Sequence, residues 1–227
     1  MAARANPRPE EIDVTALDEH EITIDAAGAT LPGRLAVPAD PRGLVVFAHG
    51  SGSSRHSPRN RFVAGILEQA GLATLLIDLL TDDEAADRAN VFDIELLGGR
   101  VGAVAAGARA DERLRHVRLG LFGASTGAAA ALVAAASADA DVAAVVSRGG
   151  RPDLAGDHLR RVTAPTLLIV GGRDTQVLAL NQDAARLLRA EHRLEVVPGA
   201  THLFEEPGTL EAAADLARDW FVTHLRG

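Results

Sequence analysis

Short apolar runs recur along the chain at regular intervals. After two β-rich stretches at residues 21–26 and 31–38, continuous apolar runs lie at 43–48, 73–80, 117–123, 142–147, 165–172 and 193–199. A strand buried on both faces of a parallel sheet requires a continuous run of this kind, because side chains on both faces meet other apolar groups. We therefore expect a mostly parallel sheet of about eight strands.

Longer helical patterns separate these runs. They cover residues 59–71, 93–110, 126–138, 175–191 and 209–226. In the last, apolar residues recur at spacings of three and four and give one core-facing stripe, formed by Leu210, Ala214, Ala217, Phe221 and Leu225. Strands and helices in alternation predict an α/β doubly wound fold with helices on both faces of the sheet.

The length of 227 residues suits one domain. Residues 1–13 are polar and contain proline, so we expect a loose N-terminal tail. The rest, 14–227, contains no internal repeat or linker and is expected to form a single α/β domain.

Composition narrows the classes of function. The chain has 31 acidic residues against 23 basic ones, all arginine, and its net charge is −8. With 3% aromatic residues and no basic stripe, nucleic acid is not an expected partner. The absence of cysteine excludes disulfides, cysteine metal sites and thiol catalysis.

Two further features bear on location. No apolar stretch follows the N-terminal arginines, and the apolar block 128–136 is far shorter than the roughly 20 residues that span a bilayer. We expect a cytoplasmic protein without membrane contact, either a monomer or a small homo-oligomer.

The first candidate for chemistry is Ser125, in the segment GASTG at 123–127. The segment follows an apolar run and opens a helical pattern, which is the strand–turn–helix context of a nucleophile elbow. Small residues at both ends let strand and helix approach closely. The alternative is a glycine-rich turn whose serine caps the helix.

Two more polar residues follow later strands. Asp174 comes just after the run 165–172, and His202 follows the run 193–199. Asp174 could instead cap the next helix, and a lone histidine is usually structural. The order Ser125, Asp174, His202 is that of the α/β-hydrolase triad, with each residue after a different strand, and this favours the catalytic interpretation.

The small-residue loop AHGSGSS at 48–54 could turn a backbone N–H toward the same edge of the sheet. We expect the N–H groups of Ser51 and Thr126 to form an oxyanion hole, with Gly52 as the alternate to Ser51. His49 is expected to brace this loop.

These motifs resemble those of the α/β-hydrolase superfamily, in particular of dienelactone hydrolase-like proteins. The segments AHGSGSS, GASTG, GGRD and PGATHLF carry the resemblance, and SGSSRHSPRN with SRGGRPDL is similar to hydrolase domains sometimes fused to phosphoribosyltransferases. The resemblance covers nearly everything after residue 20. It implies an α/β-hydrolase fold and a serine hydrolase with Ser125, Asp174 and His202 as its triad. Dienelactone hydrolases use a cysteine nucleophile, which this chain lacks, so lactone specificity does not carry over.

The expected reaction is hydrolysis of a small carboxylic ester through an acyl-serine intermediate, without metal or organic cofactor. A thioesterase, an amidase, an acyltransferase and a non-catalytic binding module of the same fold stay open. A nucleotide-binding interpretation is disfavoured because HGSGSS lacks the third glycine of the G-x-G-x-x-G fingerprint.

The substrate is less defined. The segment 148–164 is too short for a cap domain, so an open site is expected. Arg55, Arg148 and Arg151 lie near the predicted site, and one of them could bind a substrate carboxylate. The alternative is that they form salt bridges that hold loops in place. The acidic stretch TDDEAADR at 81–88 is expected to be a solvated loop.

Overall fold

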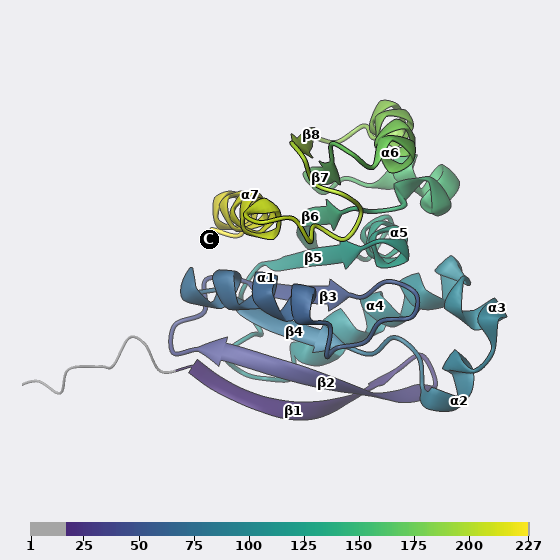
Figure 1. Cartoon of the computed structure of the whole chain (residues 1–227). Helices are drawn as coiled ribbons and strands as arrows, with labels where there is room; N and C mark the ends of the chain where they lie inside the picture. The colour runs from purple at the N-terminus through teal and green to yellow at the C-terminus, as the bar shows by residue number, and fades with distance from the viewer. Residues whose placement is uncertain (1–16, 227) are drawn as a thin grey trace, which may run out of the picture.

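The computed structural model describes residues 17–226. The expected tail at 1–13 lies outside the described residues. Figure 1 shows the chain folded around one twisted sheet with helices on its two faces.

The sheet has eight strands in the order β1-β2-β4-β3-β5-β6-β7-β8. β1 pairs antiparallel with β2, and β2 pairs antiparallel with β4, while all other pairs are parallel. The strands are β1 (Leu17–Ala26), β2 (Ala29–Pro38), β3 (Leu44–Ala48), β4 (Ala73–Ile77), β5 (Leu119–Ala124), β6 (Val142–Arg148), β7 (Thr166–Gly171) and β8 (His192–Val197).

Helices cover the sheet on both sides. α1 (Pro58–Gln69) and α7 (Thr209–His224) pack on one face, where they share an apolar cluster with the sheet. The other face carries α4 (Ile94–Ala108), α5 (Thr126–Ala135), α6 (Thr175–Leu187) and the 3₁₀ helix η1 (Pro152–Arg161). This arrangement confirms the predicted fold class.

The strand β3 shows why continuous apolar runs are required. Its residues Leu44, Val46 and Ala48 belong to the cluster under α4 and α5. The alternate residues Val45 and Phe47 belong to the cluster under α1 and α7. Both faces of the strand are therefore buried, as the period of two in a strand dictates.

The acidic stretch after β4 differs from the expectation of a solvated loop. It contains two short helices, α2 (Asp82–Ala85) and α3 (Arg88–Val91). Thr81 and Glu84 form a capping box at the start of α2, in which each side chain binds the other residue's backbone N–H. The acidic side chains of α2 thus lie in its first turn, where the helix dipole favours them.

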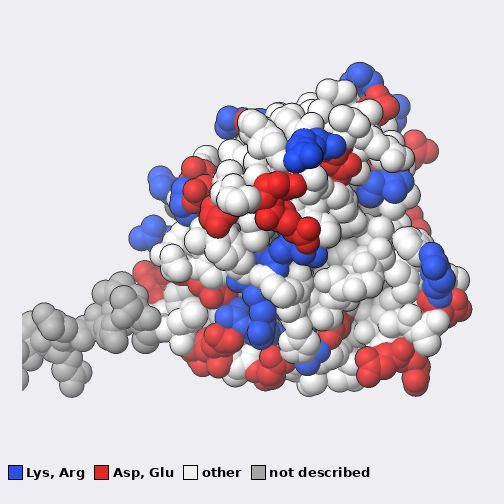
Figure 2. All heavy atoms as spheres, viewed as in Figure 1, with Lys and Arg blue, Asp and Glu red and all other residues white. Residues whose placement is uncertain are grey.

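Between β6 and β7, a stretch that is described throughout, the chain forms η1 and its flanking turns. In residues 17–226 no helix combines the length and the apolar character that crossing a bilayer requires. Figure 2 shows acidic and basic side chains interspersed over the visible face.

Candidate active site

Ser125 lies at the turn between β5 and α5, with a backbone conformation that L residues rarely adopt. Its φ is 52° and its ψ is −123°. A Cβ on Gly123 would lie 2.3 Å from Ala128 Cα, and one on Gly127 would lie 2.2 Å from the Ala48 carbonyl oxygen. In both cases the added Cβ would clash with backbone atoms, which cannot move aside as a flexible side chain can. The turn therefore requires glycine at both positions. Although Ser125 is at the N-cap position, its side chain makes no capping hydrogen bond.

Asp174 and His202 meet across the ends of β7 and β8. The distance from His202 Nδ1 to Asp174 Oδ2 is 2.7 Å. Asp174 is at the N-cap position of α6, but its side chain makes no capping hydrogen bond. Its carboxylate therefore binds the imidazole rather than the helix. The Asp174 side chain is 14% exposed and that of His202 is 38% exposed, so the acid is shielded while the base reaches solvent.

The loop that carries His202 is fixed by contacts that the sequence did not indicate. The N–H of Thr201 donates to Glu206 Oε2 at 3.0 Å, and this contact holds the pKa of Glu206 below its usual range. Phe204 has a φ of 55° and its side chain is buried. A Cβ on Gly149 would lie 3.1 Å from the His202 carbonyl oxygen, so the end of β6 presses closely on this loop.

Ser125 and His202 line one cavity of about 270 Å³. Its other walls come from the loop after β3, the start of α1 and the end of β6. The structure therefore brings Ser125, His202 and Asp174 to the same edge of the sheet. Their catalytic roles stay a prediction.

The proposed oxyanion donors lie side by side, but one of them is engaged. Thr126 is the first residue of α5, where the backbone N–H has no carbonyl within the helix to bind. The Ser51 N–H donates to Thr126 Oγ1 at 2.8 Å. The role of the Ser51 amide as an oxyanion donor stays a prediction, and in this structure that amide binds the threonine hydroxyl. Gly52, the alternate, has a φ of 70° and does not line the Ser125 cavity.

His49 braces the loop at 48–54. Its Nδ1 is 2.9 Å from the Gly50 carbonyl oxygen and its Nε2 accepts the Leu79 N–H at 3.2 Å. These two contacts require a neutral ring with its proton on Nδ1. Burial lowers the pKa of His49, which favours the same form.

The three arginines differ in their partners. Arg55 pairs with Asp78 and Glu21, and Arg151 pairs with Asp153, so both hold loops. Neither lines the Ser125 cavity. Arg148 does line it, and its side-chain partner among residues 17–226 is Asn60 and not an acidic residue.

A second cavity of about 210 Å³ shares the loop at 48–54 with the Ser125 cavity. Ser51 and Thr126 line it, and the rest of its wall is mixed. The polar side chains there are His49, Ser53, Ser54, Asp78 and Asp82. The apolar side chains are Leu79, Leu80, Ala85, Val91 and Leu97.

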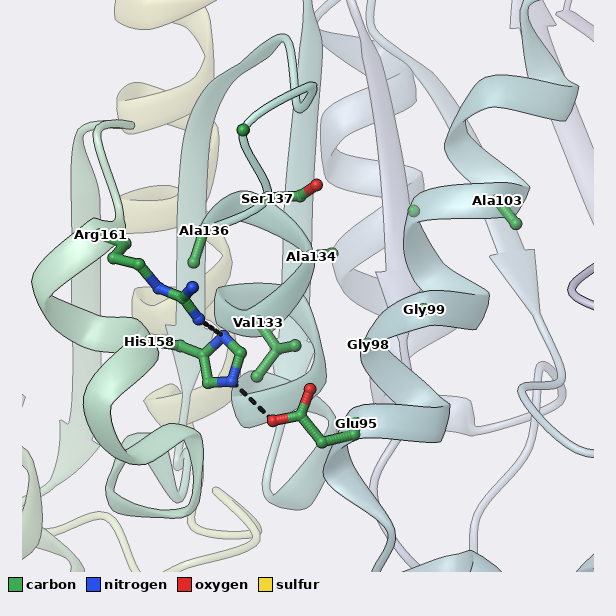
Figure 3. A pocket seen from close by; sticks show the side chains of 12 residues that line it. Glu95, Gly98, Gly99, Ala103, Val133, Ala134, Ala136, Ser137, His158 and Arg161 are labelled. Carbon is green, nitrogen blue, oxygen red and sulfur yellow. Dashed lines mark hydrogen bonds and ion pairs between the residues drawn. The ribbon is translucent and has the colours of Figure 1, made fainter.

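A wider groove of about 540 Å³ lies away from these residues, between α4, α5 and η1. Figure 3 shows His158 between Glu95 and Arg161 at one side of it. His158 Nε2 is 2.6 Å from Glu95 Oε1, and its Nδ1 is 2.7 Å from an Arg161 nitrogen. The contact of His158 with Glu95 joins η1 to α4, whereas the hydrogen bond from Arg161 lies within η1. The groove contains none of the predicted catalytic residues.

Comparison with known proteins now identifies the family. The model of the dienelactone hydrolase family matches residues 31–224. The chain belongs to the dienelactone hydrolase family. It is 52% identical to a dienelactone hydrolase of known structure from Anabaena variabilis, with a TM-score of 0.89, covering 92% of this chain and 99% of that one.

More distant structures share the fold. Est1E from Butyrivibrio proteoclasticus superposes with a TM-score of 0.76 at 17% identity, covering 90% of this chain and 98% of that one. The dienelactone hydrolase family and its structural neighbours support a hydrolase of the α/β-hydrolase fold.

Curated relatives from two strains of Mycobacterium tuberculosis are 60% identical over 211 residues. Each is named "Putative phosphoribosyl transferase". The match covers 93% of this chain but 48% of each relative, so the chain spans about half their length.

Proposed function

We propose that this member of the dienelactone hydrolase family is a serine hydrolase that cleaves small carboxylic esters. The observation that carries the proposal is that His202, whose Nδ1 pairs with Asp174, lines the same cavity as Ser125. The strained elbow at Ser125 adds support, because residues held at positive φ cluster at functional sites. Serine takes the place of a cysteine nucleophile, since the chain has no cysteine.

The first half of the reaction acylates Ser125. The hydroxyl oxygen attacks the ester carbonyl carbon while His202 Nε2 accepts the hydroxyl proton. Asp174 accepts the hydrogen bond from His202 Nδ1–H, which leaves Nε2 unprotonated and orients it. The imidazolium then protonates the alkoxide that leaves, and the alcohol departs.

The second half restores the enzyme. Water attacks the acyl carbon as His202 removes its proton, and the carboxylic acid is released from Ser125 when His202 returns that proton to the serine oxygen. In both halves the carbonyl oxygen becomes an anion. The amides of Thr126 and Ser51 would stabilise it, each contributing roughly 3 to 4 kcal/mol. Because Thr126 Oγ1 now accepts the Ser51 N–H, its hydroxyl must move aside or share that donor.

The nucleophile is tested by Ser125→Ala on p-nitrophenyl esters of short acyl chains. We expect kcat/KM to fall by a factor on the order of 10³ or more while the fold is unchanged by circular dichroism. Ser137→Ala is the matched control, because Ser137 is an exposed serine just beyond the other end of α5. Hydrolysis that survives in Ser125→Ala would remove Ser125 from the mechanism.

The same three residues could also serve thioester, amide or acyl-transfer chemistry. Matched esters, thioesters and amides of one acyl group separate these reactions by kcat/KM, and an added alcohol detects transfer. A non-catalytic binding module is the alternative from another class. It is favoured if a fluorophosphonate probe fails to label the wild-type protein at Ser125.

A further inference from the structure

Arg148, the last residue of β6, is a buried cation beside Ser125. Its residue surface is 6% exposed, and its carbonyl oxygen accepts the Ser125 N–H at 3.4 Å. The guanidinium lies 5.7 Å from the centre of the Phe204 ring and 6.0 Å from that of Phe122. Aromatic faces attract the cation but do not neutralise its charge.

The hydrogen bonds of Arg148 are incomplete. Nη2 donates to Asn60 Oδ1 at 3.1 Å, whereas Nε and Nη1 are buried without a hydrogen-bond partner among the described residues. Burial and the nearby Arg59 lower the pKa of Arg148 to about 10, so it is still charged at neutral pH. A buried charge without a partner costs several kcal/mol and is normally compensated.

The other buried arginines show what compensation looks like in this protein. Arg34 pairs with Glu19 and Glu68, and Arg100 pairs with Glu84. Arg148 has no such carboxylate in residues 17–226. The difference indicates that an anion from outside the chain neutralises Arg148 and accepts its remaining hydrogen bonds.

The cavity around Arg148 suits an anion that accepts hydrogen bonds from several directions. Among the described residues, no aspartate or glutamate lines it. Arg59 adds a second guanidinium at the rim, where it also pairs with the exposed Glu205 at 3.5 Å. Ser53, Ser57 and Asn60 bring hydroxyl and amide groups. A carboxylate would be satisfied by one guanidinium edge, whereas a phosphate carries about −1.5 to −2 charges and three acceptor oxygens.

We propose that this cavity binds a phosphate group of the substrate through Arg148, with Arg59 and Asn60 assisting. The substrate class is then a small ester that carries a phosphate on the part lying in the polar cavity. The site of cleavage rests on the proposed function, but binding of the phosphate does not. A volume of about 270 Å³ limits the group to a short chain.

Binding is measured without catalysis by titrating inorganic phosphate into the Ser125→Ala protein in a calorimeter. We expect saturable binding, and we expect Arg148→Met to weaken it by about tenfold or more. Arg151→Met is the matched control and should bind as before, because Arg151 lies outside the cavity and pairs with Asp153. Absence of binding, or binding unchanged in Arg148→Met, overturns the proposal. Acetate bound as tightly as phosphate overturns the choice of phosphate.

A second variant covers the case in which Arg148→Met does not fold. Asn60→Asp is nearly isosteric. It places a carboxylate beside Arg148 Nη2, the nitrogen that now donates to Asn60 Oδ1. It would neutralise Arg148 in place and should also weaken phosphate binding by about tenfold. A folded Asn60→Asp protein with wild-type phosphate affinity contradicts the proposal.

Kinetics on the wild-type protein separate this inference from the proposed function. The substrates are p-nitrophenyl esters of pentanoate, glutarate and γ-phosphonobutyrate, which share one chain length and differ in the terminal group. We expect kcat/KM to be highest for the phosphonate, and the preference to disappear in Arg148→Met. If no ester is cleaved while phosphate still binds, the proposed function fails alone. If esters are cleaved without preference and phosphate does not bind, the phosphate site fails alone.

Discussion

At the scale of single residues, the site depends on places where backbone atoms nearly touch. Ser125 is held at positive φ, a conformation that costs on the order of 1–3 kcal/mol and persists only when its surroundings enforce it. The surroundings are the glycines on either side, whose missing side chains let α5 begin directly against β3 and β5. The position of the hydroxyl is therefore set by packing and not by a hydrogen bond of its own.

Gly127→Ala should show this directly. The added methyl would meet the Ala48 carbonyl oxygen, so we expect a loss of about 2–3 kcal/mol in the free energy of unfolding. Gly99→Ala is the control within a helix, because Gly99 is exposed on α4 with open space around it, and it should gain about 0.5–1 kcal/mol. Urea unfolding followed by circular dichroism measures both. Equal effects of the two substitutions would contradict the close approach.

His49 predicts how stability changes with pH. Burial lowers its pKa below 6.5, although Asp78 at 4.0 Å opposes this. Between the folded-state pKa and 6.5 the unfolded chain binds a proton that the folded chain does not, so stability falls as pH falls, by up to about 1.4 kcal/mol per unit. In His49→Gln, which keeps an acceptor for the Leu79 N–H, that part of the slope should vanish. Urea unfolding from pH 7.5 to 5 measures it, and identical slopes for both proteins would contradict the prediction.

The sequence indicated Ser125, Asp174 and His202 because each follows an apolar run, and the carboxyl ends of parallel strands share one edge of the sheet. It could not single out Arg148. The partner of Arg148, Asn60, is 88 residues away and lies on α1. Whether an arginine has an acidic partner depends on tertiary packing, which the local sequence pattern does not specify.

At the scale of elements, long periodic segments were predictable and short ones were not. The pattern at 93–110 predicted α4, which spans 94–108. The helices α2 and α3 have four residues each, too few for an apolar period to appear. Capping chemistry was the available signal, since Thr81 and Glu84 have the spacing of a capping box.

Glu84 also links α2 to the core. Its carboxylate binds Arg100 of α4 and the Thr81 N–H, which together lower the pKa of Glu84 to about 2. Arg100 is almost fully buried and also donates to the Leu79 carbonyl oxygen. Asp82 and Ala85 of α2 and Val91 of α3 line the second cavity, so the contacts of Glu84 fix one wall of that cavity.

Glu84→Gln should cost about 1–3 kcal/mol at neutral pH, because it leaves a buried guanidinium without its counterion. Since the pKa is depressed, the contribution of Glu84 is present above 4.5 and is lost as pH falls toward 2. The difference in the free energy of unfolding between the wild type and the variant should accordingly become smaller at acid pH. Asp183→Asn breaks an exposed pair with Arg186 and should change stability by less than about 0.5 kcal/mol. Denaturant unfolding at neutral and acid pH tests this, and a gap that widens in acid would refute it.

At the scale of the molecule, apolar runs predicted that a parallel sheet exists, but not which strands are neighbours. β4 lies outside β3, between it and the antiparallel β2, and no feature of either run specifies this order. The order follows from how each crossover helix packs back on a face of the sheet. The outcome is two apolar clusters, one on each face, with the central strands contributing to both.

This shared sheet predicts cooperative unfolding, even though the chain is longer than most two-state domains. β3 and β5 place alternate side chains in the two clusters, so neither cluster can open without exposing strands that the other needs. Trp220, the single tryptophan, lies in the cluster under α7 and reports on that face, while circular dichroism reports on all helices. We expect urea transitions from tryptophan fluorescence and circular dichroism to coincide.

Because α7 crosses the back of the sheet and contacts both β6 and β7, its release alone would uncover the central strands. A fluorescence transition clearly below the circular dichroism midpoint would show that the α1–α7 face opens by itself.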